Sequence, residues 1–263
     1  MSRTALVLSA GGMFGAYQAG AWRALADYFE PDLVVGASIG AINGWAIAGR
    51  CDPDDLVESW LHLDDLSSYR FRVPRELTGG IVDSQAVEKL VRDTHARYSP
   101  RIDYGLVLTD SLRLRPRIVR GPDVTWRHLA ASAAIPGIFN QHRVDGRIHC
   151  DGGLLNALPL WAAAEMGAER IVALNALPVS PNRLIREFIK ILRALTPAQP
   201  KMPQSIEVIQ IAPSGSLGSA KAALCWKREN AQRWIDQGRA DAAGVCALAK
   251  FAGSCQVGRE VRV

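Results

Sequence analysis

The stretch from Asp32 to Ala48 constrains the fold of this chain more than any other part of the sequence. Leu33 to Val35 form a short apolar run that is typical of a buried parallel strand. The strand is followed by Gly36-Ala37-Ser38-Ile39-Gly40, which has the spacing G-x-S-x-G, and then by a mostly apolar segment suited to a helix. A sharp strand-to-helix turn with a central serine is the pattern of a nucleophile elbow, because the flanking glycines remove side chains that would clash there. Ser38 is therefore a candidate nucleophile, but this spacing also arises by chance and needs supporting residues.

A glycine-rich loop precedes the elbow. Thr4 to Ser9 predict a first strand, residues 11–15 read Gly-Gly-Met-Phe-Gly, and Ala16 to Phe29 have a helical pattern. This order implies two parallel strands joined by a right-handed crossover, which brings the loop beside Ser38. The backbone amides that can then face a developing oxyanion belong to Gly11, Gly12 and Met13. A nucleotide-binding loop is the rival interpretation, although the spacing departs from G-x-G-x-x-G and no Gly-Lys-Ser/Thr follows.

Strands and helices alternate along most of the remaining chain. This alternation predicts an α/β fold with a mostly parallel central sheet covered on both faces, in a single domain spanning residues 1–263. The further predicted helices cover residues 52–63, 85–98, 123–134, 159–167 and 226–251. The further predicted strands cover residues 105–109, 115–120, 143–150, 170–175 and 206–212. Residues 143–150 contain an Asp145-Gly146 hairpin turn. Asp52, Asp54 and Asp55 are interpreted as a helix start rather than a Ca²⁺ loop, and Ser84 as a helix cap.

Composition narrows the class of protein. The net charge of +5 is spread over single arginines, which does not favour a nucleic-acid partner. Five cysteines without a C-x-x-C pair argue against a disulfide framework and against a zinc site, and fit a reducing compartment. Neither a cleavable signal peptide nor a transmembrane segment is apparent, so we expect a cytoplasmic protein.

Two kinds of residue are candidates for the base that would activate Ser38. One is a histidine in a triad such as Ser38 with Asp110 and His149, chosen from His62, His95, His128, His142 and His149. The other is Asp151, which ends a predicted strand just before Gly152-Gly153 and has apolar neighbours in the sequence. Burial would raise the pKa of Asp151 and make it a competent base. The residues alone leave both alternatives open.

Four blocks that occur in one order give the chain a family resemblance. They are the glycine loop, residues 36–43 around Ser38, residues 131–137 (Ala-Ser-Ala-Ala-Ile-Pro-Gly), and Asp151-Gly152-Gly153 with Asn156-Ala157-Leu158-Pro159. Over about residues 4–176 the chain resembles the patatin-like phospholipases. The resemblance implies a three-layer α/β/α fold and hydrolysis of lipid acyl esters, as by a phospholipase A or a lysophospholipase, on a Ser–Asp dyad without cofactor or metal.

Carried onto this chain, the resemblance implies that Ser38 is the nucleophile and Asp151 the base. It also implies an oxyanion hole made by the backbone of Gly11, Gly12, Met13 and Gly15. The chain departs from the family pattern at Phe14, where many members have Arg or Lys, and at Ser9-Ala10, where a further glycine is common. An acyltransferase using the same acyl-serine and a non-catalytic nucleotide- or lipid-binding module are the alternative functions.

Residues 183–195 predict an amphipathic helix within an excursion at 182–196. Its apolar face holds Leu184, Ile185, Phe188, Ile191, Leu192 and Leu195, and its basic face holds Arg183, Arg186, Lys190 and Arg193. Such a helix suits peripheral contact with a membrane or a lid over Ser38. The same pattern also suits a helix packed on the core with its basic face in solvent.

Overall fold

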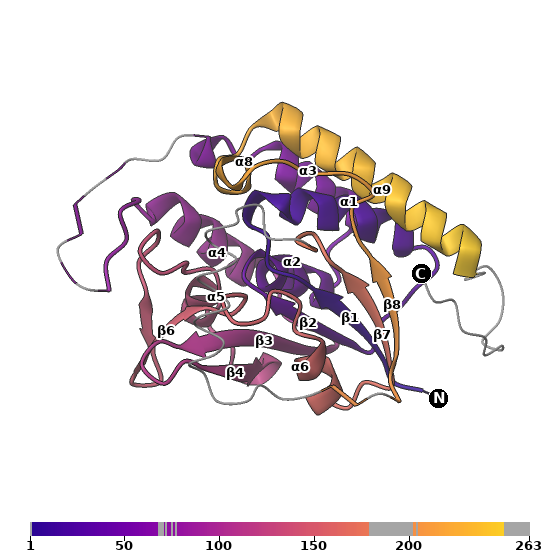
Figure 1. Cartoon of the computed structure of the whole chain (residues 1–263), viewed down its shortest axis with the longest axis horizontal. Coiled ribbons are helices and arrows are strands. Elements are labelled where there is room, and N and C mark those ends of the chain that lie inside the picture. Colours follow the sequence, from indigo (N-terminus) through magenta and orange to yellow (C-terminus); the bar gives the residue numbers. More distant parts are fainter. Residues whose placement is uncertain are drawn as a thin grey trace.

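A computed structural model describes residues 2–67, 71, 73–74, 76, 78–178, 202–203 and 205–249, the last four without their side chains. Figure 1 shows the described elements around a central sheet. The amphipathic segment predicted at 183–195 lies outside the described residues. No helix within the described ranges combines the length and the apolar character needed to cross a membrane.

The sheet is mixed and mostly parallel, as the sequence predicts. Its described strands are β1 (Thr4–Leu8), β2 (Leu33–Ala37), β3 (Asp103–Asp110), β4 (Arg115–Arg120), β5 (His142–Val144), β6 (Arg147–Asp151), β7 (Arg170–Leu174) and β8 (Glu207–Ile211). They lie in the order β5-β6-β3-β2-β1-β7-β8, and β4 also pairs with β3. The five strands from β3 to β8 along this order are parallel, whereas β4, β5 and β6 join through antiparallel pairs.

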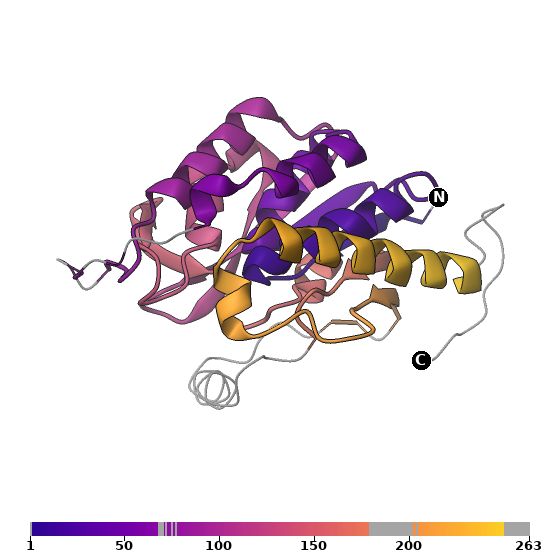
Figure 2. The same ribbon diagram turned by 90° about the horizontal axis from the view of Figure 1, so that it is seen from above.

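Helices cover both faces of this sheet (Figures 1 and 2). The helices on the larger layer are α1 (Gly15–Leu25), α2 (Ile39–Ala48), α3 (Pro53–Leu61), α4 (Gln85–Arg97), α5 (Trp126–Ser132), α8 (Ala220–Leu224) and α9 (Arg228–Ala249). The opposite face is covered, among the described residues, by α6 (Leu160–Glu165). The described residues also form three short 3-10 turns, which are η1 (Gly12–Phe14), η2 (Asp64–Leu66) and η3 (Gly121–Asp123).

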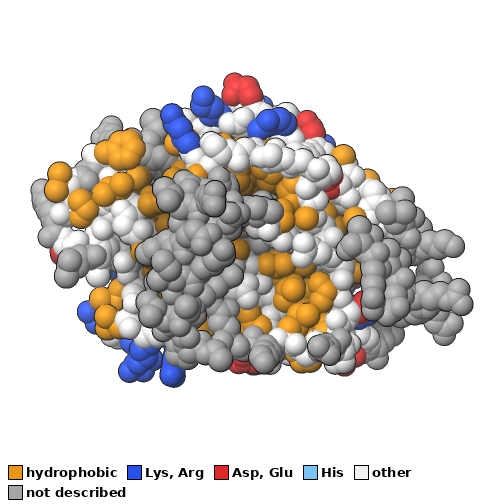
Figure 3. Space-filling model, in the orientation of Figure 1, with side chains coloured by type: hydrophobic (Ala, Val, Ile, Leu, Met, Phe, Trp, Pro, Cys, Tyr) orange, Lys and Arg blue, Asp and Glu red, His pale blue; other side chains and the backbone are white. Residues whose placement is uncertain are grey.

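Alternating strand residues supply two separate hydrophobic cores. Leu6 and Leu8 of β1 pack under the larger helical layer, whereas Ala5 and Val7 of the same strand pack under α6. Burial on both faces explains why the central strands are apolar throughout instead of alternating with polar residues. On the face shown in Figure 3, hydrophobic side chains gather toward the centre and charged side chains lie along the upper and lower edges.

Local signals set several boundaries. Asp52 caps α3 by accepting the amides of Asp54 and Asp55, which confirms the predicted helix start. Asp145 and Gly146 have φ of 49° and 74°, as the predicted hairpin turn requires. Ser84 is the N-cap residue of α4, as predicted, but its hydroxyl accepts the amide of Asn140 instead of an amide of its own helix.

Two predicted helices are shorter than the sequence pattern suggested. The first helix stops at Leu25 instead of Phe29. The helix predicted at 123–134 covers only 126–132 because Thr125 and His128 form a capping box at its start.

Candidate active site

Two strands meet end to end beside β3. Because β4 occupies one edge of β3 from residue 105 to residue 110, β2 and β6 share the other edge. Ala37, the last residue of β2, lies opposite Val107, and Asp151, the last residue of β6, lies opposite the next residue, Leu108. The carboxyl ends of β2 and β6 therefore face each other, and this topology brings Ser38 to Asp151 across 113 residues of sequence.

The backbone at Ser38 is strained in the way the elbow pattern predicts. Ser38 has φ 56° and ψ −128° and directly precedes α2, so its side chain sits at the positive end of a helix. A Cβ on Gly36 would lie 2.2 Å from the carbonyl oxygen of Gly40, and a Cβ on Gly40 would lie 2.5 Å from the carbonyl oxygen of Leu8. Both glycines of G-x-S-x-G are thus required by close backbone approach.

The Ser38 hydroxyl donates a hydrogen bond to Asp151. Its Oγ lies 2.6 Å from Oδ2 of Asp151, and both residues are 5% exposed. The other carboxylate oxygen accepts the amide of Gly153 at 2.7 Å. Burial raises the pKa of Asp151 to about 6, and the hydrogen bonds from Ser38 and Gly153 oppose this shift. The carboxylate is therefore mostly ionised and able to accept a proton near neutral pH.

Ser132, at the end of α5, holds the turn at Ser38 in place through hydrogen bonds. Its buried hydroxyl accepts the amide of Ser38 at 2.9 Å and donates to the carbonyl of Val107 at 2.9 Å. The amide of Gly152 in turn donates to the Ser132 carbonyl at 3.2 Å. One residue thus touches the segments that carry both candidate catalytic groups. This role of Ser132 was not predicted from the sequence, although a serine inside an otherwise apolar helix end was a usable signal.

The glycine loop follows β1 and lies next to the elbow. The close approach of Gly40 to the carbonyls of Leu8 and Ser9 places the end of β1 against the start of α2. Among the described residues, no acceptor takes the amides of Gly11, Gly12 and Met13, so these three are available as donors. The Gly15 amide is different, because it donates to the carbonyls of Gly12 and Met13.

A buried polar network holds the loop to α2. Asn43 donates to the carbonyl of Gly15 and to Gln18, and accepts the indole N–H of Trp60 at 3.1 Å. Gln18 donates to the carbonyl of Ser9 at 2.7 Å. This role of Gln18 was not predicted from the sequence, yet a glutamine on a fully buried helix face is the kind of residue that needs such partners.

Phe14 takes the loop position at which the family resemblance led us to expect Arg or Lys. Its side chain is buried, with its ring edge-to-face on Trp234 of α9 and the ring centroids 5.0 Å apart. The departure at Ser9 also has a structural reason, because its buried hydroxyl accepts the amide of Ala176 at 2.9 Å. Both departures therefore add packing or hydrogen bonds around the loop.

The histidines make other contacts. All five lie in the described part of the chain, and Ser38 has no hydrogen bond to any of them. His149 lies opposite Asp110 in the sheet, but its Nδ1 faces the carbonyl of Arg147 at 3.2 Å and its Nε2 has no partner among the described residues. Burial lowers the pKa of His149, so its neutral form is favoured. The triad of Ser38, Asp110 and His149 is therefore not formed in this structure.

A family profile described as patatin-like phospholipase matches residues 6–164. This chain belongs to the patatin-like phospholipase family. The match lies within the region of 4–176 that the sequence blocks indicated, and it contains Ser38, Ser132 and Asp151.

Relatives agree with this membership, and a solved structure shares the fold. The chain is 33% identical over 190 residues to an uncharacterized NTE family protein of Mycobacterium tuberculosis, covering 69% of this chain and 51% of that protein. It is 27% identical over 182 residues to human patatin-like phospholipase domain-containing protein 6, covering 65% of this chain and 13% of that protein. The crystal structure of VipD from Legionella pneumophila shares the fold, with TM-score 0.52 and 13% identity over 94% of this chain and 67% of that one. The patatin-like chain thus spans about half the length of its mycobacterial relative.

Proposed function

We propose that the protein hydrolyses acyl esters of lipids through an acyl-serine intermediate on Ser38. The observation that carries the proposal is the 2.6 Å hydrogen bond from the Ser38 hydroxyl to a buried carboxylate. A serine hydroxyl is a weak nucleophile until a base takes its proton, and Asp151 is the group in contact with it. Membership of the patatin-like phospholipase family supports a lipid ester as the substrate class.

In the proposed reaction, Asp151 accepts the Ser38 proton while Oγ attacks the ester carbonyl. The amides of Gly11, Gly12 and Met13 stabilise the oxyanion, and the N-terminus of α2 adds a favourable dipole. Protonated Asp151 then gives its proton to the leaving alcohol or lysolipid. A water molecule attacks the acyl-serine with Asp151 again as the base, and the acid leaves as Ser38 regains its proton.

A fluorophosphonate probe, which labels activated serines, tests this assignment. We expect labelling of the wild-type protein, no labelling of Ser38→Ala, and strongly reduced labelling of Asp151→Asn. His142→Ala and His149→Asn are matched controls that should retain most of the labelling. Labelling that persists in Ser38→Ala would refute the nucleophile, and complete loss in a histidine variant would favour a triad.

A further inference from the structure

A groove runs along the outer face of α2 and begins at Ile39, the residue that follows the candidate nucleophile Ser38 in the sequence. Its floor is formed by Ile39, Ile42 and Ala46, which share one face of the helix and begin directly after Ser38. The groove has a cavity volume of about 370 Å³, within the range of about 300–1,000 Å³ typical of small-molecule sites. From Ile39 to Ala46 the floor is about 10 Å long at the α-helical rise per residue.

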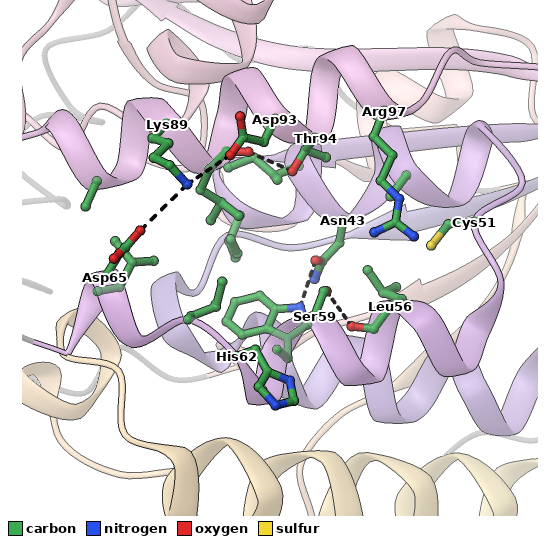
Figure 4. Close-up of a pocket in the computed structure, with 18 of the residues that line it drawn as sticks. Asn43, Cys51, Leu56, Ser59, His62, Asp65, Lys89, Asp93, Thr94 and Arg97 are labelled. Carbon is green, nitrogen blue, oxygen red and sulfur yellow. Dashed lines mark hydrogen bonds and ion pairs between the residues drawn. The ribbon is translucent and has the colours of Figure 1, made fainter.

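Helices α3 and α4 form the two walls of this groove (Figure 4). Leu56 and Trp60 line it from α3, Leu66 from η2, and Ala86 and Leu90 from α4. Leu66 and Ala86 supply further apolar surface at the end of the groove that begins at Ile39. The far end is closed by the region of Cys51 and Tyr98.

Three polar side chains that line the groove, Asn43, Ser59 and Thr94, are already bonded to the protein. The hydroxyl of Ser59 donates to the carbonyl of Leu56 at 2.7 Å, and that of Thr94 donates to the carbonyl of Leu90 at 2.8 Å. The amide group of Asn43 is occupied by Gly15, Gln18 and Trp60, as described above. These groups therefore lose no hydrogen bond when an apolar ligand displaces water from the groove.

The lysine and arginine side chains that line the groove, Lys89 and Arg97, each form ion pairs. Figure 4 shows Lys89 reaching from α4 toward Asp65 on the opposite wall; its Nζ lies 3.7 Å from Asp65 and 3.2 Å from Asp93. Arg97 pairs with Asp55 at 3.1 Å. An anionic ligand group would have to compete with these pairs, whereas a hydrocarbon chain can lie beneath the Lys89–Asp65 bridge on the apolar floor.

We propose that this groove holds the acyl chain of the substrate, with the ester carbonyl at Ser38 and the chain running along α2 toward Ala46. The proposal rests on the proposed function, because it assigns the chain of an ester that Ser38 attacks. Each methylene that enters the groove should raise kcat/KM about fourfold until the groove is full, since burying one methylene changes an equilibrium by about that factor. Specificity for chain length would then be set by α2, α3 and α4.

The test measures kcat/KM for p-nitrophenyl butanoate, octanoate and dodecanoate. Ala86→Trp places an indole at the mouth of the groove and should lower kcat/KM for octanoate and dodecanoate at least tenfold while changing butanoate less than twofold. Ala96→Trp is the matched control, because Ala96 is exposed on the same helix and does not line the groove, and it should keep the wild-type profile. Leu90→Ala enlarges the groove and should raise the ratio of dodecanoate to octanoate activity, which keeps the test decisive if Ala86→Trp does not fold.

The possible results distinguish a failure of the groove proposal from a failure of the proposed function. If the wild-type protein hydrolyses these esters but Leu90→Ala and a folded Ala86→Trp leave the chain-length profile unchanged, or lower all three substrates equally, the groove proposal is wrong. If the wild-type protein neither hydrolyses any ester nor reacts with the fluorophosphonate, the proposed function fails and the groove proposal fails with it.

Discussion

Replacing Asp151 by Asn should strongly lower the activity and, at neutral pH, stabilise the protein. The carboxylate of Asp151 is buried, and burial raises its pKa from 3.8 to about 6. A shift of about two pKa units corresponds to about 3 kcal/mol of ionisation cost that the folded protein bears above pH 6. Asn has the same shape and carries no charge, so it removes this cost while its side-chain oxygen can still accept the amide of Gly153.

The pH dependence of this difference has a definite sign. The unfolded chain releases the Asp151 proton near pH 4, whereas the folded protein keeps it up to about pH 6. Between these values the native state binds more protons, so this group makes the wild-type protein less stable as pH rises. Asp151→Asn should therefore gain about 3 kcal/mol over the wild type at pH 8, and well under 1 kcal/mol of that advantage should remain at pH 4.

Urea unfolding followed by tryptophan fluorescence measures both free energies of unfolding, since the chain has seven tryptophans. Asp123→Asn, at an exposed carboxylate in η3, is the matched control and should show no such pH-dependent gain.

In the same proteins, kcat/KM of the wild type should rise with pH up to about 6 and then level off, because only ionised Asp151 accepts a proton. Asp151→Asn should lose about a hundredfold or more in kcat. An equal stability difference at pH 4 and pH 8 would refute the raised pKa of Asp151.

Two further substitutions test how the elbow is held. Ser132→Ala leaves the Ser38 amide and the Val107 carbonyl without their partner; we expect a loss of about 1–3 kcal/mol in stability and a fall in kcat of about tenfold or more at similar KM. Ser84→Ala is its control, since it removes another buried hydroxyl that accepts an amide and should leave kcat unchanged. Gly40→Ala forces a Cβ against two backbone carbonyls and should lower the stability by about 1–3 kcal/mol, measured by thermal unfolding. Gly244→Ala, in open space on α9, should be neutral or stabilising by up to about 1 kcal/mol, and an equal effect of the two glycine changes would contradict the close-approach argument.

Local sequence signals predicted much of the fold because they report local physics. The β-branched run at β2 and the glycines of the elbow encode a buried strand and a tight turn, and both are found. Asp145-Gly146 encodes a hairpin because both residues must take positive φ. Predictions were poorest at helix ends: the side chain of Ser84 could bond either its own helix or a distant amide, and it bonds Asn140.

The candidate site likewise combines features that the sequence determined with features that only the fold decided. By itself, the sequence determined the kinds of group present: a serine on an elbow, a glycine loop after the first strand, and an aspartate at the end of a strand, with several histidines competing as the base. Only the tertiary structure decided among them, because β3 offers one edge to both β2 and β6 and so sets their carboxyl ends face to face. Strand pairing between distant segments is a property of the whole sheet, and it is this pairing that gives Ser38 its carboxylate and buries that carboxylate deeply enough to raise its pKa.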